Sequence, residues 1–227
     1  MEKGQKRAEF FQIYLLLAGL CVIGAGVLAL CWAAKVRLPE GVGRVLPAEE
    51  QAAVIERNSP LTEYVFLSPN ADFPREGTIQ KITIHHMARD LSLENLGVSF
   101  SNKDRRASSN YAIDSQGRVA LYVEEQNRAW TSSSPENDHQ AVTIEVANDE
   151  LEGDWHVSDA TFNTLIELCA DVCRRNGIDR LVFTGDETGN LTTHKMFNPD
   201  TQCPGPYLEG KMEEIAGRVN ERLAQDG

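Results

Sequence analysis

Two histidines and one cysteine are the residues of this chain best suited to bind a metal ion. His85 lies in the strand-like run ITIHH, His194 in LTTHKMF and Cys203 in TQCPGPY. Imidazole nitrogen and thiolate sulfur both suit Zn²⁺, and a site with three protein ligands leaves one coordination position for water or substrate. An open position is typical of catalytic zinc. If the three side chains converge, they predict a hydrolase.

The strand that contains His85 offers a second histidine beside it. From Lys81 to His86 successive side chains alternate between the two faces, so His86 shares a face with Ile82 and Ile84. His85 lies on the more polar face at the end of the strand, where residues from loops can reach it. We therefore expect His85 to be the ligand. His86 is expected to be a hydrogen-bonded structural histidine or a substrate-binding residue next to the metal.

The other two candidate ligands lie in a stretch with several turn-forming residues. His194 and Cys203 are separated by a segment that contains Asn, Pro and Asp, and Cys203 is followed by Pro204 and Gly205. Proline restricts the preceding residue to extended backbone, and glycine permits the turn that follows. This context fixes the direction of the thiol. Taken alone, each histidine or cysteine is more often a packing or surface residue than a ligand.

A carboxylate lies within an otherwise apolar strand, in the run AVTIEVAN. Val142, Ile144 and Val146 face one way, whereas Thr143 and Glu145 face the other. A hydrolytic zinc site needs a base near its water, and a positioned carboxylate can take that proton and pass it to the leaving amine. Periodicity alone leaves open a solvated residue on an exposed sheet face.

Several separated motifs together resemble a known family. In chain order they are ITIHHMA, SSNYAIDSQGRVALYVEEQNRAW, NDHQAVTIEVAND, LTTHKMF and TQCPGPYL. This series resembles the zinc-dependent N-acetylmuramoyl-L-alanine amidases of type 2, which include phage lysozyme-type amidases and are similar to animal peptidoglycan recognition proteins. The resemblance runs from about Tyr64 to the C-terminal helix.

The resemblance implies one zinc ion per chain, bound by His85, His194 and Cys203, with cysteine where some members have aspartate. It places Glu145 on the carboxylate that some members use near the zinc-bound water. The implied reaction is hydrolysis of the amide between the lactyl group of N-acetylmuramic acid and L-alanine of the stem peptide in peptidoglycan.

Three further residues receive roles from the resemblance or its context. Tyr111 falls on the family's active-site tyrosine, and Thr201 occupies a position where some members have a catalytic lysine. Both would donate hydrogen bonds to the oxyanion. Trp130, in a polar loop after a strand, is expected to line the substrate groove. The strand pattern alone, without the resemblance, favours Tyr111 as a half-buried aromatic residue of a strand.

The N-terminal stretch from Phe10 to Ala34 contains no charged residue in 25 positions. At about 1.5 Å per residue, such a helix crosses the roughly 30 Å hydrocarbon core of a bilayer. The stretch is longer than the apolar region of a cleaved signal peptide, and the bulky Leu30 before Cys31 makes a poor lipoprotein site. The sequence predicts an uncleaved single-pass signal anchor in the cell membrane. A cell-wall substrate favours a domain outside the cytoplasm.

Four segments are therefore expected along the chain. They are a cytoplasmic tail at 1–9, a transmembrane anchor at 10–34, a proline-containing juxtamembrane linker at 35–63 with a short helix near 48–57, and an amidase domain at 64–227. Beyond Arg37 the remaining residues carry a net charge of about −15, which argues against nucleic acid and anionic lipid surfaces as partners. The expected partners are peptidoglycan and, through residues 10–34, the membrane.

The remaining pattern predicts an α/β fold, a single domain with a central mixed β-sheet flanked by helices. Strands are expected near 80–86, 109–114, 117–123, 141–147 and 180–184. Between the last two, apolar residues recur at helical spacing, with Ser158 or Asp159 to cap the helix and Gly177 to end it. Cys169 and Cys173 lie on its buried stripe and are expected in the core. A final helix is expected from about Tyr207 to Ala224.

Two other classes of function stay open. The domain could bind peptidoglycan without cleaving it, although such a module would be expected to lack the third ligand. It could also be a cysteine peptidase that uses Cys203 with a histidine. Nucleophilic cysteines are favoured at helix N-termini or beside a base, and the CPG turn suits a metal ligand better.

Overall fold

A computed structural model describes residues 41–44 and 46–225 of the chain. Its main element is a six-stranded mixed β-sheet with the order β1-β5-β4-β7-β3-β8, and a short antiparallel pair, β2 and β6, lies beside it. All neighbouring strands of the large sheet are parallel except β4 and β5. The strands are β1 (Thr62–Val65), β2 (Ala71–Asp72), β3 (Lys81–His86), β4 (Tyr111–Ile113), β5 (Val119–Leu121), β6 (Arg128–Ala129), β7 (Ala141–Val146) and β8 (Leu191–Thr193).

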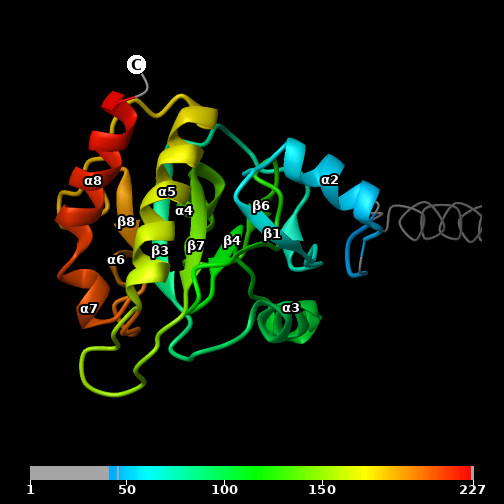
Figure 1. Ribbon diagram of the computed structural model, residues 1–227, viewed down its shortest axis with the longest axis horizontal. Coiled ribbons are helices and arrows are strands. Elements are labelled where there is room, and N and C mark those ends of the chain that lie inside the picture. Colours follow the sequence, from blue (N-terminus) through cyan, green and yellow to red (C-terminus); the bar gives the residue numbers. More distant parts are fainter. Residues whose placement is uncertain (1–40, 45, 226–227) are drawn as a thin grey trace, which may run out of the picture. The chain divides into compact units, whose positions relative to one another are not determined.

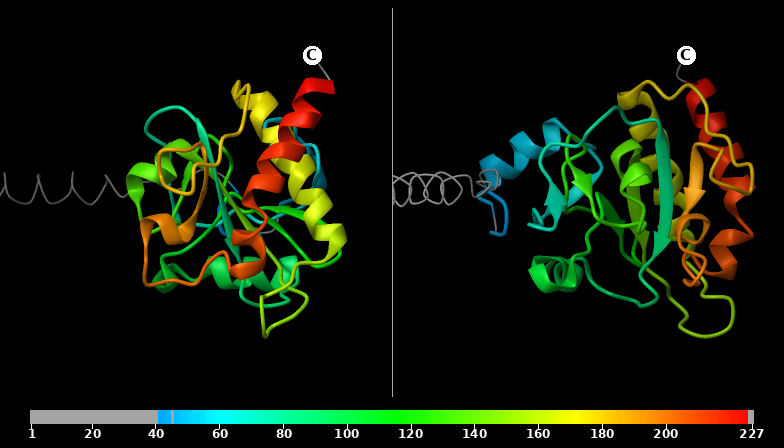
Figure 2. Two further views of the ribbon diagram at one scale, coloured as in Figure 1. Left: turned by 90° about the vertical axis from the view of Figure 1, so that its left-hand side faces the viewer. Right: turned by 180° about the vertical axis from the view of Figure 1, so that it is seen from behind.

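Helices pack on both faces of this sheet. The longest, α5, runs beside α8 (Figures 1 and 2), and α3 lies apart from both. The helices are α2 (Ala48–Glu56), α3 (Leu93–Ser101), α4 (Pro135–Gln140), α5 (Asp159–Asn176), α6 (His194–Phe197), α7 (Pro206–Glu209) and α8 (Met212–Gln225), with a 3-10 turn at Lys103–Arg105. The predicted class, an α/β domain with a mixed central sheet flanked by helices, is confirmed.

Strand register determines which side chains share a face. Ile84 of β3 lies opposite Ile144 of β7, which lies opposite Tyr111 of β4. We call the face with these residues the apolar face. The next residue along β3 and β7 places His85 opposite Glu145 on the other side of the sheet, which we call the polar face.

The two faces have different coverings. The apolar face contributes to the main core together with the buried stripes of α5 and α8, which include Leu165, Cys169 and Ile215. α3 covers the polar face near β4 and β5 through a smaller apolar cluster that includes Ala112 and Phe100. The polar face of β3 and β7 is not covered in this way, and α4 approaches it with polar side chains.

Most predicted elements are confirmed, including the short helix near 48–57 and the caps of α5. The Ser158 hydroxyl accepts a hydrogen bond from the Thr161 amide, and Gly177 follows the helix with a φ of 67°. The strand predicted at 180–184 is wrong. Val182 instead takes part in a loop, where its carbonyl accepts from the amides of Asn190 and Leu191. The place beside β3 belongs to β8, and the predicted final helix is divided at Gly210 into α7 and α8.

The described part of the predicted linker packs against the domain. Leu46 and Val54 belong to the main core, and β1 pairs with β5. The predicted membrane anchor at 10–34 lies outside the described residues. Within the described ranges, no helix combines the length and the apolar character needed to span a bilayer.

Arg75 connects the loops at the amino-terminal edge of β7. The residue is 9% exposed, and its guanidinium donates to the backbone carbonyls of Glu125, Asn127, Asp138, His139 and Ala141. Burial lowers the pKa of Arg75 to about 10, partly offset by the carboxylates of Glu125 and Asp138. The side chain therefore remains a cation at neutral pH and satisfies carbonyls that would otherwise lack donors.

Replacement of Arg75 is expected to destabilise the domain strongly. Arg75→Ala leaves several buried carbonyls without a donor, so we expect a loss of about 3 kcal/mol or more in the free energy of unfolding, measured with urea. Arg75→Lys keeps the positive charge but has fewer donors, so it should restore only part of the lost free energy of unfolding. Arg44→Ala is the control, because Arg44 pairs with Glu50 at the exposed surface and such pairs contribute about 0–1 kcal/mol. Equal effects of Arg75→Ala and Arg44→Ala would contradict this role.

Candidate metal centre

The structure brings His85, His194 and Cys203 together. One ligand atom from each lies within 4.8 Å of the others. The Cys203 Sγ is 3.5 Å from the His85 Nδ1, and the two imidazole rings have centroids 4.8 Å apart. Strand pairing explains this convergence, because Thr193 of β8 lies near the carboxyl end of β3 in register with Ile84. His194 follows Thr193 directly and so reaches the end of β3, where His85 lies.

Cys203 is held by the turn around it. Its carbonyl accepts from the Lys195 amide at 3.1 Å, and its amide donates to the Thr201 hydroxyl at 3.2 Å. The His86 amide donates to the Cys203 sulfur at 3.4 Å. The predicted oxyanion donor Thr201 therefore lies in the turn that holds Cys203, two residues before it, and its hydroxyl oxygen accepts a hydrogen bond from the Cys203 amide.

Glu145 lies beside the cluster on the polar face of the sheet. It is the direct neighbour of His85 across the β3–β7 pair. Its Oε2 atom is enclosed and has no hydrogen-bond partner among the described residues. Burial raises the pKa of Glu145 to about 8. The carboxyl is thus able to hold or release a proton near neutral pH, as a proton-transfer group requires.

The donor set fits a zinc ion. Burial lowers the pKa of both His85 and His194, so the imidazoles are neutral and can offer a lone pair. Burial, with a smaller effect of Glu145, raises the pKa of Cys203, so its thiol is protonated without a cation nearby. Metal binding would displace that proton. The enclosed Nε2 atom of His85 has no partner among the described residues.

Tyr111 is not brought to this cluster. It pairs with Ile144 and so lies on the apolar face, whereas His85 and Glu145 lie on the polar face. Its fully buried hydroxyl donates to Glu125 at 2.7 Å and accepts from the Ser59 amide at 2.9 Å. The prediction that Tyr111 donates to an oxyanion beside the candidate ligands is therefore wrong. Alternation along the strands places the Tyr111 side chain on the opposite face of the sheet from His85 and Glu145.

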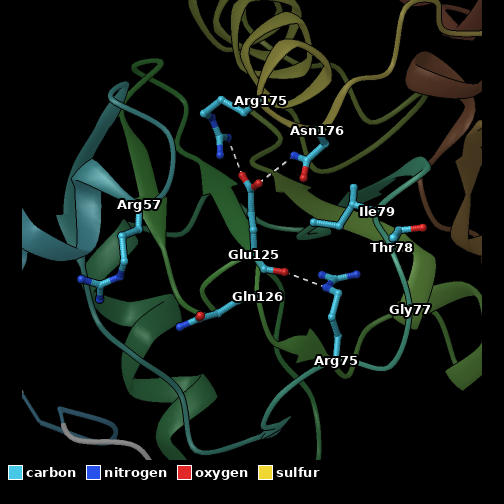
Figure 3. Close-up of a pocket in the computed structure, with 9 residues that line it drawn as sticks. All are labelled: Arg57, Arg75, Gly77, Thr78, Ile79, Glu125, Gln126, Arg175 and Asn176. Atoms are coloured by element: carbon cyan, nitrogen blue, oxygen red, sulfur yellow. Dashed lines mark hydrogen bonds and ion pairs between the residues drawn. The ribbon is translucent and has the colours of Figure 1, made fainter.

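The carboxylate that binds Tyr111 borders a hollow of about 730 Å³ (Figure 3). Glu125 also accepts from Arg175 and from the Asn176 amide. Arg57, at another side of the hollow, is paired with Glu124. The first pair thus connects the loop after β5 to α5, and the second connects the same loop to the end of α2.

Trp130 and His194 line a second cavity of about 340 Å³. The Trp130 indole nitrogen donates to Asp72 at 3.0 Å, which fixes the ring at the cavity wall. Trp130 therefore lines a cavity beside His194, and its predicted role in the substrate groove stays a prediction. Sequence reasoning missed Arg106, Arg128 and Ser133, which also line it. The two adjacent arginines, Arg105 and Arg106, just before the SSNYAID run were the feature of the sequence that could have pointed to Arg106.

His86 packs away from this cavity. Its ring meets Trp155 edge-on, with centroids 5.4 Å apart, and a Cβ added to Gly205 would lie 3.0 Å from its Nδ1. His86 is therefore buried under the CPG turn, but its Nδ1 has no hydrogen-bond partner among the described residues, so the predicted hydrogen-bonded structural role stays a prediction. Burial lowers its pKa to about 4, offset in part by Asn148. The alternative role, contact with substrate, stays a prediction.

Comparison with known proteins gives a family and a fold. Residues 75–206, more than half of the chain, match the family model described as N-acetylmuramoyl-L-alanine amidase. No curated protein matches the sequence. The solved catalytic domain of XlyA is 14% identical, with a TM-score of 0.53, over 69% of this chain and 97% of that one. A mutant of PlyL is 15% identical (TM-score 0.51; 78% and 95%), and an AmpD derivative is 16% identical (0.51; 67% and 93%).

The raised pKa of Glu145 predicts how the metal-free protein responds to pH. The folded state holds this proton up to about pH 8, whereas the unfolded chain releases it near the ordinary value of 4.5. The free energy of unfolding should therefore fall as pH rises from about 4.5 to 8, by at most about 1.4 kcal/mol per pH unit. Urea titrations with chelator at several pH values would measure it.

Glu145→Gln removes the titrating group and should flatten this part of the pH profile. Glu213→Gln, an exposed position on α8, is the control and should keep the wild-type profile. Parallel profiles for wild type and Glu145→Gln would show that burial does not hold the proton on Glu145.

Proposed function

The chain belongs to the N-acetylmuramoyl-L-alanine amidase family, and we propose that it uses zinc to hydrolyse the amide bond between N-acetylmuramic acid and L-alanine in peptidoglycan. The observation that supports the zinc is the convergence of His85, His194 and Cys203 within 4.8 Å. Two neutral imidazoles and a thiol form a donor set of the kind that zinc prefers, and three protein ligands leave a position for the reacting groups.

Each residue has a chemical task in this proposal. Bound at the cluster, zinc supplies a Lewis acid for the lactyl carbonyl and makes a water molecule acidic enough to lose a proton near pH 7. Glu145 accepts that proton and delivers it to the nitrogen of L-alanine as the amide bond breaks. A bound cation would favour the ionised carboxylate over the proton that burial holds on it in the metal-free protein, which leaves Glu145 able to accept the proton of the water.

Donors to the developing oxyanion come from the cluster side of the sheet. Thr201 is the candidate, because its hydroxyl lies in the turn that holds Cys203. The hydroxyl oxygen accepts a bond from the Cys203 amide, and the hydroxyl hydrogen can still be donated to the oxyanion. A donor aimed at the oxyanion contributes roughly 3 kcal/mol in other enzymes. Tyr111 has no part in this step because its hydroxyl is committed to Glu125.

The cavity beside His194 is the proposed place of the peptide stem. Its volume of about 340 Å³ is in the range of small-ligand sites. Trp130 offers an aromatic wall, and the cationic Arg106 and Arg128 suit the carboxylates of a stem peptide. Arg128 is paired with Asp72, whereas Arg106 forms no ion pair with another residue in the described ranges. Arg106 is thus the cation available to substrate.

The two alternative functions are weaker. A module that only binds peptidoglycan needs neither Cys203 at the cluster nor Glu145 beside it. A cysteine peptidase needs a thiolate, but burial raises the pKa of Cys203, and the residue is only 7% exposed. Buried cysteines of this kind are poor nucleophiles.

Metal content and peptide release test the reaction. We expect one zinc per chain and release of peptides that begin with L-alanine from purified peptidoglycan, both lost with a chelator. Cys203→Ser should weaken zinc binding, whereas Glu145→Gln should keep zinc and reduce kcat by about 100-fold or more. Full activity of the metal-free protein would contradict the zinc mechanism. Bound zinc without peptide release would favour the binding module.

The proposal includes a membrane tether formed by residues 10–34, with the domain outside the cytoplasm. Its support is the uncharged 25-residue stretch and a substrate that lies in the cell wall. The full chain should sediment with membranes and resist extraction by high salt. Protease added to spheroplasts should degrade the domain. A protected domain would reverse the orientation, and a chain released by salt would exclude the tether.

A further inference from the structure

Ser133 has a backbone conformation that serine rarely adopts. Its φ is 64°, in the left-handed region that favours glycine. The residue lies in the loop between β6 and α4, is exposed, and lines the cavity beside His194. A non-glycine residue is strained at such an angle and persists only where its surroundings impose the conformation.

The neighbours of Ser133 impose this conformation from both sides. On one side, the amides of Thr131 and Ser132 donate to the Asp138 carboxylate at 3.0 and 3.1 Å. On the other side, Ser134 caps α4 by accepting from the Asn137 amide at 3.3 Å. The chain must turn between two fixed points, and Ser133 is the residue that makes the turn.

The strained residue directs its hydroxyl to a candidate zinc ligand. The Ser133 Oγ lies 3.4 Å from the His194 Nε2. Ser133 and His194 both line the cavity, whereas His85 and Cys203 do not. The Nε2 edge of His194 thus lies beside the serine, and the other ring nitrogen, Nδ1, is left for the cluster. In a neutral imidazole, a proton on one nitrogen leaves the lone pair on the other.

We propose that Ser133 is a positioning residue for zinc binding: its hydroxyl accepts a hydrogen bond from the Nε2–H of His194 and so fixes the Nδ1 lone pair toward His85 and Cys203. This inference rests on the proposed zinc site. Groups that orient ligand imidazoles commonly change metal affinity by about 10- to 100-fold when removed. Glycine would relieve the strain that the neighbours impose at this position, but it would lack the hydroxyl that makes this bond.

Three substitutions separate the hydroxyl from the strain. Ser133→Ala removes the hydroxyl and keeps the strained backbone. Ser133→Gly removes both. Ser133→Thr keeps the hydroxyl but adds a β-branch, which the left-handed region tolerates poorly. Ser92→Ala is the control for stability, because it removes the α3 cap formed with the Asn95 amide at 3.2 Å and does not touch the cluster.

Zinc affinity, measured by competition with a chelator, and the Tm of the metal-free protein are the main readouts. We expect Ser133→Ala and Ser133→Gly to lose about 10-fold or more in zinc affinity, while the metal-free Tm of Ser133→Gly is no lower than that of wild type. Ser133→Thr should lower Tm but bind zinc more tightly than Ser133→Ala. Ser92→Ala should lower Tm without changing zinc affinity. The visible spectrum of the cobalt-substituted protein should change in Ser133→Ala and Ser133→Gly and stay the same in Ser92→Ala.

Other results would overturn the inference. If Ser133→Ala and Ser133→Gly bind zinc as wild type does, the serine does not position His194, even if their KM for peptidoglycan rises through a lost substrate contact. If zinc affinity only follows Tm across all four variants, the role of Ser133 is structural. A wild-type protein that binds no zinc would instead refute the proposed function together with this inference.

Discussion

The parallel register of β3 with β7 and β8 is the constraint on which the cluster of His85, His194 and Cys203 depends. It places His85 opposite Glu145 on one side and brings the end of β8 to the same edge on the other. A shift of one residue in β3 would move His85 to the opposite face of the sheet, because side chains alternate with a period of two. The register is specified by Ile82 and Ile84, both fully buried on the apolar face. The core of the domain therefore selects the residue that faces the cluster.

Polar contacts on the other face reinforce the same register. The hydroxyls of Thr83 and Thr192 lie 2.9 Å apart, and the Asn137 amide donates to Thr83 at 2.9 Å. The Thr83 and Thr192 hydroxyls and the Asn137 amide nitrogen are thus hydrogen-bonded, whereas the Asn137 Oδ1 has no partner among the described residues. At the ends of β3 and β7, enclosed atoms of His85, His86 and Glu145 also lack a hydrogen-bond partner among the described residues. Unsatisfied buried groups destabilise a fold. Three of the six such atoms in the described ranges lie at this edge of the sheet, beside the place proposed for the zinc ion.

The sequence predicts the convergence of His85, His194 and Cys203 well and the surrounding loops poorly, for physical reasons. Alternation along a strand is local, so it distinguishes His85 from His86 without knowledge of the rest of the fold. The face that Tyr111 occupies depends instead on which residue of β7 lies opposite it. That residue is Ile144, which faces away from Glu145. Pairing between strands is a long-range property, so the sequence of one strand does not reveal it. Residues 180–184 illustrate the same limit. Their apolar run favours a strand, yet the edge position beside β3 is taken by Leu191–Thr193.

Backbone strain gathers around the metal centre in a way that no composition rule predicts. Within the described ranges, the non-glycine residues with positive φ are Ala88, Arg106, Ser133 and Trp155. Ala88 follows the strand that ends at His86, and Trp155 packs on the His86 ring. Arg106 and Ser133 line the cavity beside His194. The loops that surround the cluster thus share a conformation that costs energy at each position, while the sheet beneath them is regular. A regular sheet edge positions the candidate ligands, and strained loops position residues that line the cavity beside His194.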